Sequence, residues 1–226
     1  MWGNFQFDFA SSSARGHSGG IVSIWDPTFF VRDYIVSHEN YLIVAGRWVN
    51  VEEMCFMINI YSPQSVADRI ILWGLLLQFI QDKDGLFFLF GDYNEVRDID
   101  ERHGSVFSPV GAGHFNKFIE YAGLIDVQLG ARKFTWMNKL GTKLSKLDRF
   151  LVSGNVLQKF PHLNAVGLER RWSRITAPFF CMKYGTIMVP HRFGCSVRGS
   201  CWRGLMMWCD KDGHKVIIWL TNFTLT

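Results

Sequence analysis

The sequence predicts an α/β fold, with a mixed β-sheet or two stacked sheets and helices on the outside. Residues 86–90 are five consecutive apolar residues between turn residues, which is typical of a strand buried on both faces. Residues 66–81 place apolar side chains at helical spacing. Strands joined by hairpin turns are mixed with strand–helix–strand stretches along the chain. An apolar content of 48% in 226 residues is enough for a large core.

The part of the chain before the first helix predicts several strands. Residues 21–25 follow the turn at 18–20 and stop at Asp26-Pro27. Residues 34–36 and 42–45 flank the polar stretch 38–40 and predict a hairpin. Residues 54–61 predict a longer strand that ends in Asn59-Ile60-Tyr61-Ser62-Pro63.

Two helices and further short strands follow. The first helix is expected over residues 66–81, with Ser65 or Asp68 as its N-cap. A long charged loop at 97–111 separates the strand at 86–90 from a second helix at 112–121. Residues 124–127, 134–136 and 146–152 predict three more strands. The apolar stripes of the two helices are Leu72, Leu75, Leu76, Phe79 and Ile80, and Phe115, Phe118 and Ile119.

Charge divides the chain into two regions. Residues 1–173 hold 17 Lys and Arg against 18 Asp and Glu, whereas residues 174–226 hold 7 against 2. Four of the five cysteines also lie after residue 173, and their spacing indicates no disulfide framework. No apolar run reaches the ~18 residues that a membrane span needs, and the first residues do not resemble a signal peptide. We therefore expect an intracellular protein without a membrane partner, in two regions, 1–173 and 174–226.

Polar side chains follow the buried strand directly. Asp92 and Asn94 are two residues apart, so their side chains point to the same side if the backbone stays extended. A carboxylate can orient or deprotonate a water, and an amide can donate to a phosphate oxygen. This pair therefore favours phosphoester chemistry. A strand that simply ends in an Asx turn is the alternative interpretation.

Four segments in order carry a family resemblance. They are Asn59-Ile60-Tyr61-Ser62-Pro63, Gly91-Asp92-Tyr93-Asn94-Glu95-Val96, Lys133-Phe134-Thr135-Trp136 and Ser145-Lys146-Leu147-Asp148-Arg149-Phe150-Leu151-Val152-Ser153. Together they resemble the endonuclease/exonuclease/phosphatase superfamily. The closer resemblance is to the endonuclease domain of plant LINE-type retrotransposon polyproteins, and it covers about residues 2–173.

The resemblance implies a four-layer α/β sandwich that cleaves a DNA phosphodiester with Mg²⁺, in the nucleus if it is functional. By the same resemblance, Tyr61 hydrogen-bonds the scissile phosphate and Asp92 orients or deprotonates the attacking water. Asn94 helps to place phosphate and water, and Asp148 pairs with a catalytic histidine further along the chain. The resemblance assigns no metal ligand to a residue of this chain, and no oligomeric state follows from it.

A second group of residues is expected to face DNA. Thr135 and Trp136 match the DNA-facing surface of the family, and Lys133 and Lys146 belong to a basic run with Lys139 and Lys143. Such lysines can contact phosphates without reading sequence. Bland alternatives remain for single residues: the lysines as a solvated face, Tyr61 as a strand-end tyrosine, and Asp148 with Arg149 as a surface ion pair.

Two departures from the family predict an inactive copy. The family has an upstream strand with an asparagine and a metal-binding glutamate, and this sequence starts after both. Where the family has Ser-Asp-His, the chain reads Ser173-Arg174-Ile175. Losing an acid–base group costs about 10²–10⁴ in rate, and losing a Lewis-acid metal costs several kcal/mol more. We therefore expect a retrotransposon endonuclease remnant, incomplete at its N-terminal strand and without turnover.

Other functions stay open at this point. One is an active metal-dependent phosphodiesterase or phosphatase, and another is a non-catalytic nucleic-acid-binding remnant. A zinc module built from Cys195, Cys201, Cys209 and His214 is disfavoured, because no Cys-x-x-Cys pair exists.

Residues 174–226 have a possible origin in the genetic code. If Arg174 ends in G and the next codons are ATC-ACT-GCC-CC, the shifted frame encodes Asp-His-Cys-Pro, the signature that is missing here. We interpret this region as a degenerate, wrong-frame tail, and expect it to be irregular because a random frame has no hydrophobic period.

Overall fold

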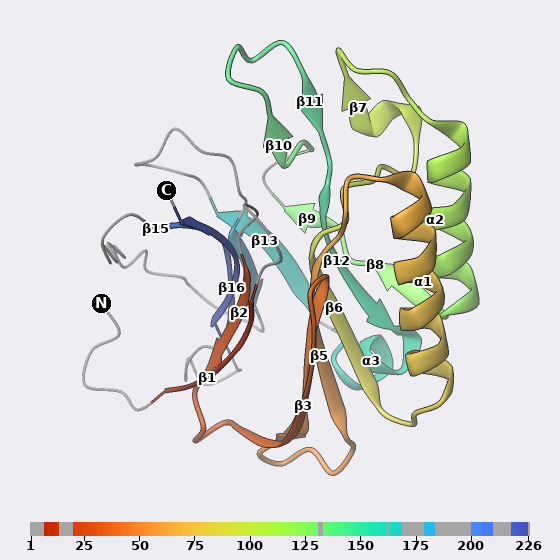
Figure 1. Cartoon of the computed structure of the whole chain (residues 1–226). Helices are drawn as coiled ribbons and strands as arrows, with labels where there is room; N and C mark the ends of the chain where they lie inside the picture. The colour runs from red at the N-terminus through yellow and green to blue at the C-terminus, as the bar shows by residue number, and fades with distance from the viewer. Residues whose placement is uncertain are drawn as a thin grey trace.

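The computed structural model describes residues 7–13, 20–130, 133–161, 163–168, 179–183, 200–209 and 218–225. It contains two large facing β-sheets (Figure 1). The six-stranded sheet has the spatial order β3 (Phe30–His38), β4 (Tyr41–Trp48), β5 (Cys55–Tyr61), β6 (Leu86–Asp92), β12 (Asp148–Ser153) and β8 (Leu124–Asp126).

The seven-stranded sheet lies opposite, and a small sheet stands above one end of the pair (Figure 1). The seven strands are β1 (Asp8–Ser12), β2 (Gly20–Trp25), β16 (Ile218–Leu225), β15 (Ser200–Cys209), β14 (Phe179–Lys183), β13 (Asn164–Leu168) and β9 (Leu129–Gly130). The small sheet consists of β10 (Trp136–Met137), β11 (Leu144–Ser145) and β7 (Arg102–His103), which follows the 3₁₀ turn η1 (Ile99–Glu101).

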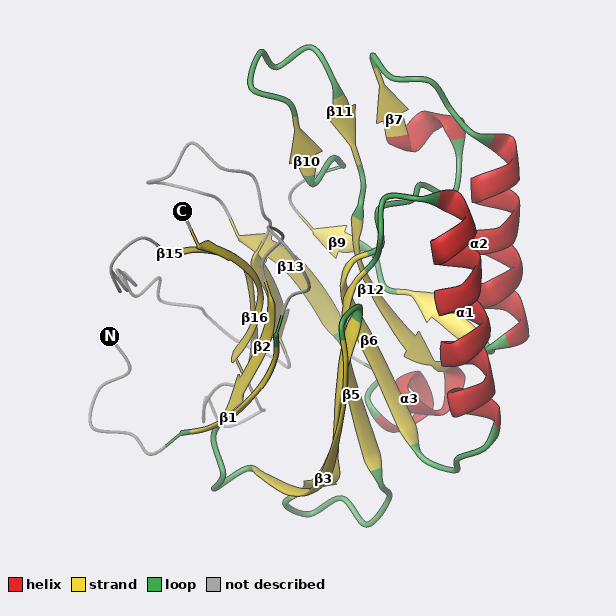
Figure 2. Ribbon diagram, in the orientation of Figure 1, coloured by secondary structure: helices red, strands yellow, loops and turns green. Residues whose placement is uncertain are grey.

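Helices complete the sandwich. α1 (Val66–Gln81) and α2 (Pro109–Tyr121) run side by side over the outer face of the six-stranded sheet, and the short α3 (Gly154–Lys159) follows β12 (Figure 2). The predicted α/β fold with two stacked sheets is confirmed. Within the described residues, the layers are sheet, sheet and helices, which are three of the four expected. No helix of the described part is long and apolar enough to cross a membrane.

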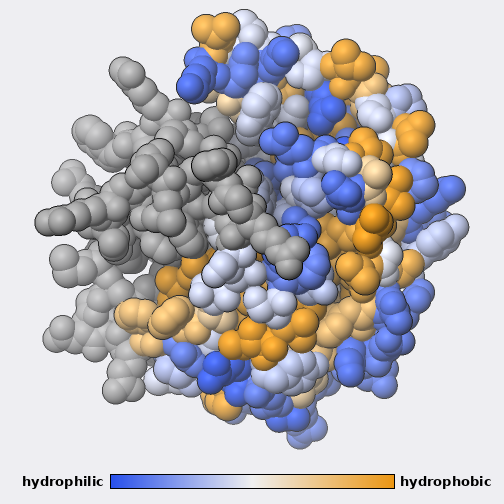
Figure 3. All heavy atoms as spheres, viewed as in Figure 1, coloured by the Kyte–Doolittle hydropathy of each residue, from blue (hydrophilic) through white to orange (hydrophobic). Residues whose placement is uncertain are grey.

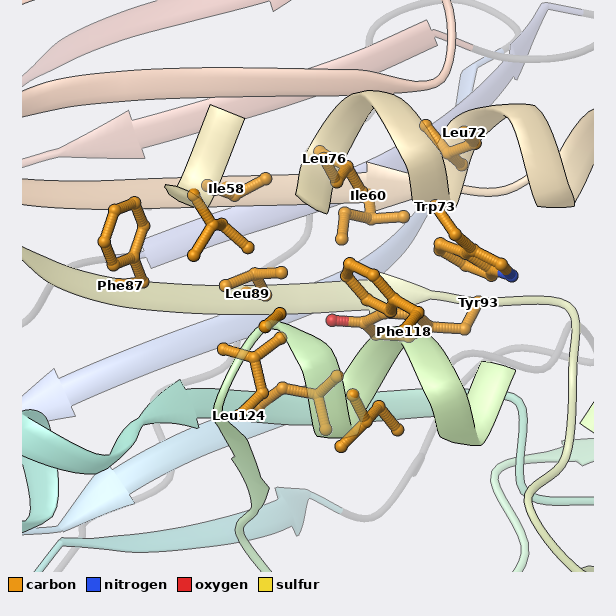
Figure 4. Packing of buried hydrophobic residues seen from close by; sticks show 14 of the residues in the cluster. Ile58, Ile60, Leu72, Trp73, Leu76, Phe87, Leu89, Tyr93, Phe118 and Leu124 are labelled. Atoms are coloured by element: carbon orange, nitrogen blue, oxygen red, sulfur yellow. The ribbon is translucent and has the colours of Figure 1, made fainter. Parts of the chain in front are cut away.

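β6 lies in the middle of its sheet, as its apolar sequence predicts. It pairs in parallel with β5 and antiparallel with β12. Phe88 and Phe90 pack into the core between the sheets, whereas Phe87 and Leu89 pack into the core under the helices. Figure 4 shows the second core, where Trp73 of α1 stacks on Phe118 of α2 with ring centroids 5.1 Å apart. The strand therefore joins both cores to the residues that follow it.

Capping explains where the helices begin. Ser65 caps α1 by accepting from the Asp68 N–H, so Ser65 rather than Asp68 is the N-cap. α2 starts three residues earlier than expected, because Ser108 caps it and Pro109 suits the first helical position. The apolar stripe of α1 was assigned partly wrongly: Leu75 is 42% exposed, and the buried face holds Arg69 and Trp73.

The region after residue 173 contributes β14, β15 and β16 to the seven-stranded sheet. The pairing of β15 with β16 shifts register between Trp202 and Leu205, and the pairing of β16 with β2 shifts between Thr221 and Phe223. The expectation of an irregular tail stays a prediction. Side chains such as Trp202 and Trp219, the segments between these strands and the possible zinc ligand His214 lie outside what the structure describes. The wrong-frame origin stays a prediction.

Candidate phosphodiesterase site

Three of the predicted site residues form one row across neighbouring strands. Tyr61, the last residue of β5, is the register partner of Asp92, the last residue of β6. Asp92 is also the register partner of Asp148, the first residue of β12. Directly opposed residues on neighbouring strands have Cβ atoms about 4.5–5.5 Å apart. The sheet therefore brings a phenol and two carboxylates together, with Asp92 in the middle.

The row lies on the face that looks toward the second sheet. Asp92 points to the same face of β6 as Phe88 and Phe90, and Asp148 to the same face of β12 as Phe150 and Val152. These four apolar residues pack between the sheets. Asp148 is 7% exposed, and Asp92 is half-buried. The row, together with Asn94, is called the strand-end site below. It lies beneath the small sheet β10–β11–β7 (Figure 1).

Gly91 and Asn94 shape the turn that carries Asp92. Gly91 has φ +127°, and a Cβ there would lie 2.1 Å from the Ile60 carbonyl oxygen. Asn94 has φ 49°, in the left-handed region that asparagine tolerates better than most residues. The Gly-Asp-x-Asn order thus has a backbone reason at both ends: a close approach to β5 and a left-handed turn.

Hydrogen bonds orient Asn94. Its backbone N–H donates to Oδ1 of Asp92 at 2.8 Å, which forms an Asx turn. Its side-chain Nδ2 donates to the Ser62 carbonyl oxygen at 2.7 Å. One N–H of the amide is therefore committed to the loop after Tyr61. The second N–H and the amide oxygen carry the chemistry that is left to Asn94.

Thr135 holds the start of β12, which carries Asp148. Its Oγ1 accepts from the backbone N–H groups of Leu147 and Asp148, both at 2.9 Å. Its own N–H donates to the Ser145 carbonyl oxygen at 3.0 Å. Thr135 was predicted to face DNA, and the structure shows a hydroxyl that already holds the backbone at Asp148.

The other residues of the predicted DNA-facing group divide into two sets. Lys133, Lys139 and Lys143 are exposed on and before the β10–β11 hairpin, and Trp136 is half-buried in it. Lys146 differs, because it is 8% exposed and its Nζ lies 3.6 Å from both Glu101 and Asp126. The structure therefore does not place Lys146 on the basic surface.

A buried ion network lies on the other face of β12. Arg149, which is fully buried, pairs with Asp126 and Glu101, so it is not the surface partner of Asp148 that one alternative supposed. Burial by itself raises the pKa of Glu101, but the hydrogen bond and charge of Arg149 outweigh it and lower that pKa below its usual value. Burial also raises the pKa of Tyr93 well above its usual value. Sequence reasoning missed this network.

A second missed pair, Arg69 and Glu95, lies behind the loops of the strand-end site, and Nη2 of Arg69 donates to Oε2 of Glu95 at 2.8 Å. One signal was available for Arg69, which is spaced three residues before Leu72 and so falls on the buried face of α1.

The donors partly fit the Mg²⁺ that the resemblance implies. Carboxylate and amide oxygens are the ligands that Mg²⁺ prefers, and it often binds through only one or two carboxylates. Asp92 and Asp148 meet that minimum. Within the described part of the chain, no group of three His, Cys, Asp or Glu residues could hold a metal ion.

Comparisons with known proteins identify the fold. No family model and no curated protein sequence matches the chain. Among solved structures, the 3′ phosphatase NExo from Neisseria, bound to a product DNA hairpin, has a TM-score of 0.52 at 16% identity, covering 70% of this chain and 71% of that one.

Two further structures are similar at lower scores. The endonuclease domain of TRAS1, a telomere-specific non-LTR retrotransposon, has a TM-score of 0.47 at 14% identity over 67% of this chain and 69% of that one. TDP2 from D. rerio, complexed with single-strand DNA product, has a TM-score of 0.47 at 18% identity, covering 75% of this chain and 72% of that one. At such identities a likeness shows the fold alone. The chain has the DNase I-like fold of the endonuclease/exonuclease/phosphatase proteins.

Proposed function

We propose that the strand-end site is the phosphodiester-binding centre of a DNA endonuclease of the retrotransposon type, and that this copy binds DNA without cleaving it. The observation that supports this most is the register row of Tyr61, Asp92 and Asp148, with Asn94 fixed beside it. Each residue stands at the sequence position that the family resemblance implies. Phosphoester hydrolysis needs such a set on a rigid frame.

The chain's own groups divide the work in this proposal. The Tyr61 hydroxyl and the remaining Asn94 N–H donate to phosphate oxygens. The Asp92 carboxylate accepts a hydrogen bond from the water that faces the phosphorus atom. Bound Mg²⁺, held by Asp92 and Asp148, would supply Lewis-acid polarisation of a phosphate oxygen.

Two features favour binding over turnover. The exposed lysines 133, 139 and 143 give the hairpin above the site a basic surface, which suits phosphate contacts. Figure 3 shows hydrophilic residues beside hydrophobic ones at the top of the molecule, where Figure 1 places this hairpin. Against turnover, Arg174 and Ile175 stand where the resemblance implies Asp-His. Without the histidine, the acid–base contribution of about 10²–10⁴ in rate is missing.

Removal of one hydroxyl tests the binding proposal. Tyr61→Phe should weaken the binding of a fluorescent DNA duplex about tenfold or more in Mg²⁺ at low salt, since one hydrogen bond to a charged phosphate contributes about 1.5–3 kcal/mol. Tyr121→Phe is the matched control, because Tyr121 is 63% exposed on α2, away from the site. Anisotropy titrations measure both. Equal affinities for the two variants would overturn the assignment of Tyr61.

A further inference from the structure

A buried ion pair lies directly behind the strand-end site. Arg69 on α1 is 6% exposed, and Glu95, which follows Asn94, is 1% exposed. Nη2 of Arg69 donates to Oε2 of Glu95 at 2.8 Å. Burying two charges is costly, and the attraction between them offsets that cost only when further hydrogen bonds are well placed. The other hydrogen bonds of Arg69 and Glu95 therefore show which backbone segments the pair keeps in place.

Arg69 holds the loop after Tyr61. Its Nη1 donates to the carbonyl oxygens of Pro63 and Gln64, at 3.2 and 2.6 Å. The guanidinium thus spans from this loop to Glu95 in the loop after Asp92. Only a rigid, planar group with several donors can contact both loops at once. A lysine keeps the charge but has a single donor centre.

Glu95 is fixed from three sides. Besides Arg69, its Oε1 accepts from the Val96 N–H at 3.1 Å. Gly111, in the first turn of α2, packs so closely that a Cβ there would lie 2.1 Å from Oε2. A carboxylate at the N-terminal end of a helix is also favoured by the helix dipole. The backbone at residue 95 therefore has little freedom.

Asn94 precedes this anchored residue and is held in an uncommon conformation. Its left-handed backbone persists only where the surroundings determine it. The two loops meet at further points, where Ser62 N–H donates to the Asp92 carbonyl oxygen at 2.8 Å and Asn94 Nδ2 donates to Ser62. The ion pair adds a further link between the two loops, because Arg69 contacts Pro63 and Gln64 in one loop and Glu95 in the other.

We propose that Arg69 and Glu95 are positioning residues of the strand-end site, which set the orientation of Asn94 toward a bound DNA phosphate. This inference rests on the proposed function for its DNA readout, and on geometry alone for its backbone readout. A merely structural pair would stabilise the fold without a specific link to Asn94.

The test replaces both partners at once. Arg69→Met with Glu95→Gln leaves no unpaired buried charge, so the variant can fold. We expect faster amide hydrogen exchange in residues 92–96, and DNA binding weaker by about tenfold, the range of one hydrogen bond to a phosphate. In an Asn94→Ala background the double substitution should cause no further loss of DNA affinity, because both changes remove the same contact between Asn94 and the phosphate. Arg69→Lys should also speed exchange in residues 92–96.

Val156→Ala is the control, because Val156 is fully buried in α3 and its loss destabilises the core without touching these loops. It should leave exchange at 92–96 and the effect of Asn94→Ala unchanged. Unchanged exchange in the double variant would overturn the inference whatever the DNA result. If the wild-type chain binds no DNA, the proposed function fails, and exchange alone decides the inference. If Asn94→Ala weakens binding but the double variant does not, the inference fails and the proposed function stands.

Discussion

At the residue scale, Gly91 sets how closely the strand that carries Asp92 approaches β5. Any side chain there would meet the Ile60 carbonyl oxygen at 2.1 Å, and φ +127° is strained for all residues except glycine. The strand ends of β5 and β6 could not stay in register with a Cβ between them. The glycine is therefore part of what places Tyr61 beside Asp92.

Substitution of two glycines by alanine tests this point. Gly91→Ala should lower the free energy of unfolding by more than about 2 kcal/mol, because backbone must move. Gly74→Ala should raise it by about 0.5–1 kcal/mol, since Gly74 lies in α1 with nothing within 4 Å of an added Cβ. Urea unfolding of both variants provides the measurement. Similar stabilities for the two variants would contradict the role given to Gly91.

Asp92 and Asn94 were found from the sequence because their chemistry follows a strand that sequence reasoning recognises well. The role of Thr135 was not found from the sequence, since a hydroxyl that accepts from two backbone N–H groups leaves no pattern in the chain. Lys146 shows the same limit. It lies among exposed lysines in sequence, yet the fold turns its ammonium toward Glu101 and Asp126.

At the scale of elements, the start of β12 depends on Thr135. Thr135→Val removes the acceptor and leaves the N–H groups of Leu147 and Asp148 unpaired, which should cost about 2 kcal/mol or more. Thr135→Ser keeps the oxygen and should cost less. Thr142→Val on the exposed part of the hairpin should change stability by less than about 0.5 kcal/mol. Equal losses for Thr135→Val and Thr135→Ser would contradict this role.

The ion network between the η1 turn and β12 predicts a pH dependence. The pKa of Glu101 is lowered in the folded chain, so its contribution is present above the unfolded pKa of about 4.3. That contribution is lost as the pH falls through the lower, folded pKa. The stability difference between wild type and Glu101→Gln should therefore be largest near neutral pH and shrink in acid.

Thermal unfolding as a function of pH measures this difference. Glu120→Gln is the control, because Glu120 is exposed on α2. It should change stability little at any pH. A difference for Glu101→Gln that grows as the pH falls would contradict the network.

Helix α1 shows why element bounds were easier to predict than faces. Its range, residues 66–81, agrees with the sequence, because a capping serine and a long periodic segment define it. Its buried face does not agree, because Ile71 and Leu75 are as apolar as Leu72 and Leu76 yet lie exposed. When nearly every position is apolar, only tertiary packing selects the face.

At the scale of the whole molecule, the central strands, both long helices and the edge strands β3 and β8 could be predicted, whereas β1, β7 and β9 could not. β1, β7 and β9 are short or polar, and they exist because neighbours offer them unpaired backbone groups. The sequence placed Asp92 at the end of a central strand, and the family resemblance added Tyr61 and Asp148. The register of β5, β6 and β12 is a long-range property, and the spacing of the motifs along the chain does not contain it.

We expect the strand-end site to bind DNA phosphate without cleaving the DNA. Supercoiled plasmid, incubated with the chain in Mg²⁺ at low salt and run on a native agarose gel, reports binding and cleavage together. Binding retards the supercoiled band, and cleavage converts it to relaxed circles. The chain with Asp92→Ala is run beside it, to separate its own cleavage from that of a contaminant.

The account predicts a retarded band, with no more relaxed circles than the plasmid alone gives. Retardation should weaken as salt is added, because phosphate contacts release counterions. Relaxed circles that form with the unmodified chain and vanish with Asp92→Ala would show an active endonuclease and contradict the loss of turnover. A band that is not retarded at any protein concentration would contradict DNA binding itself.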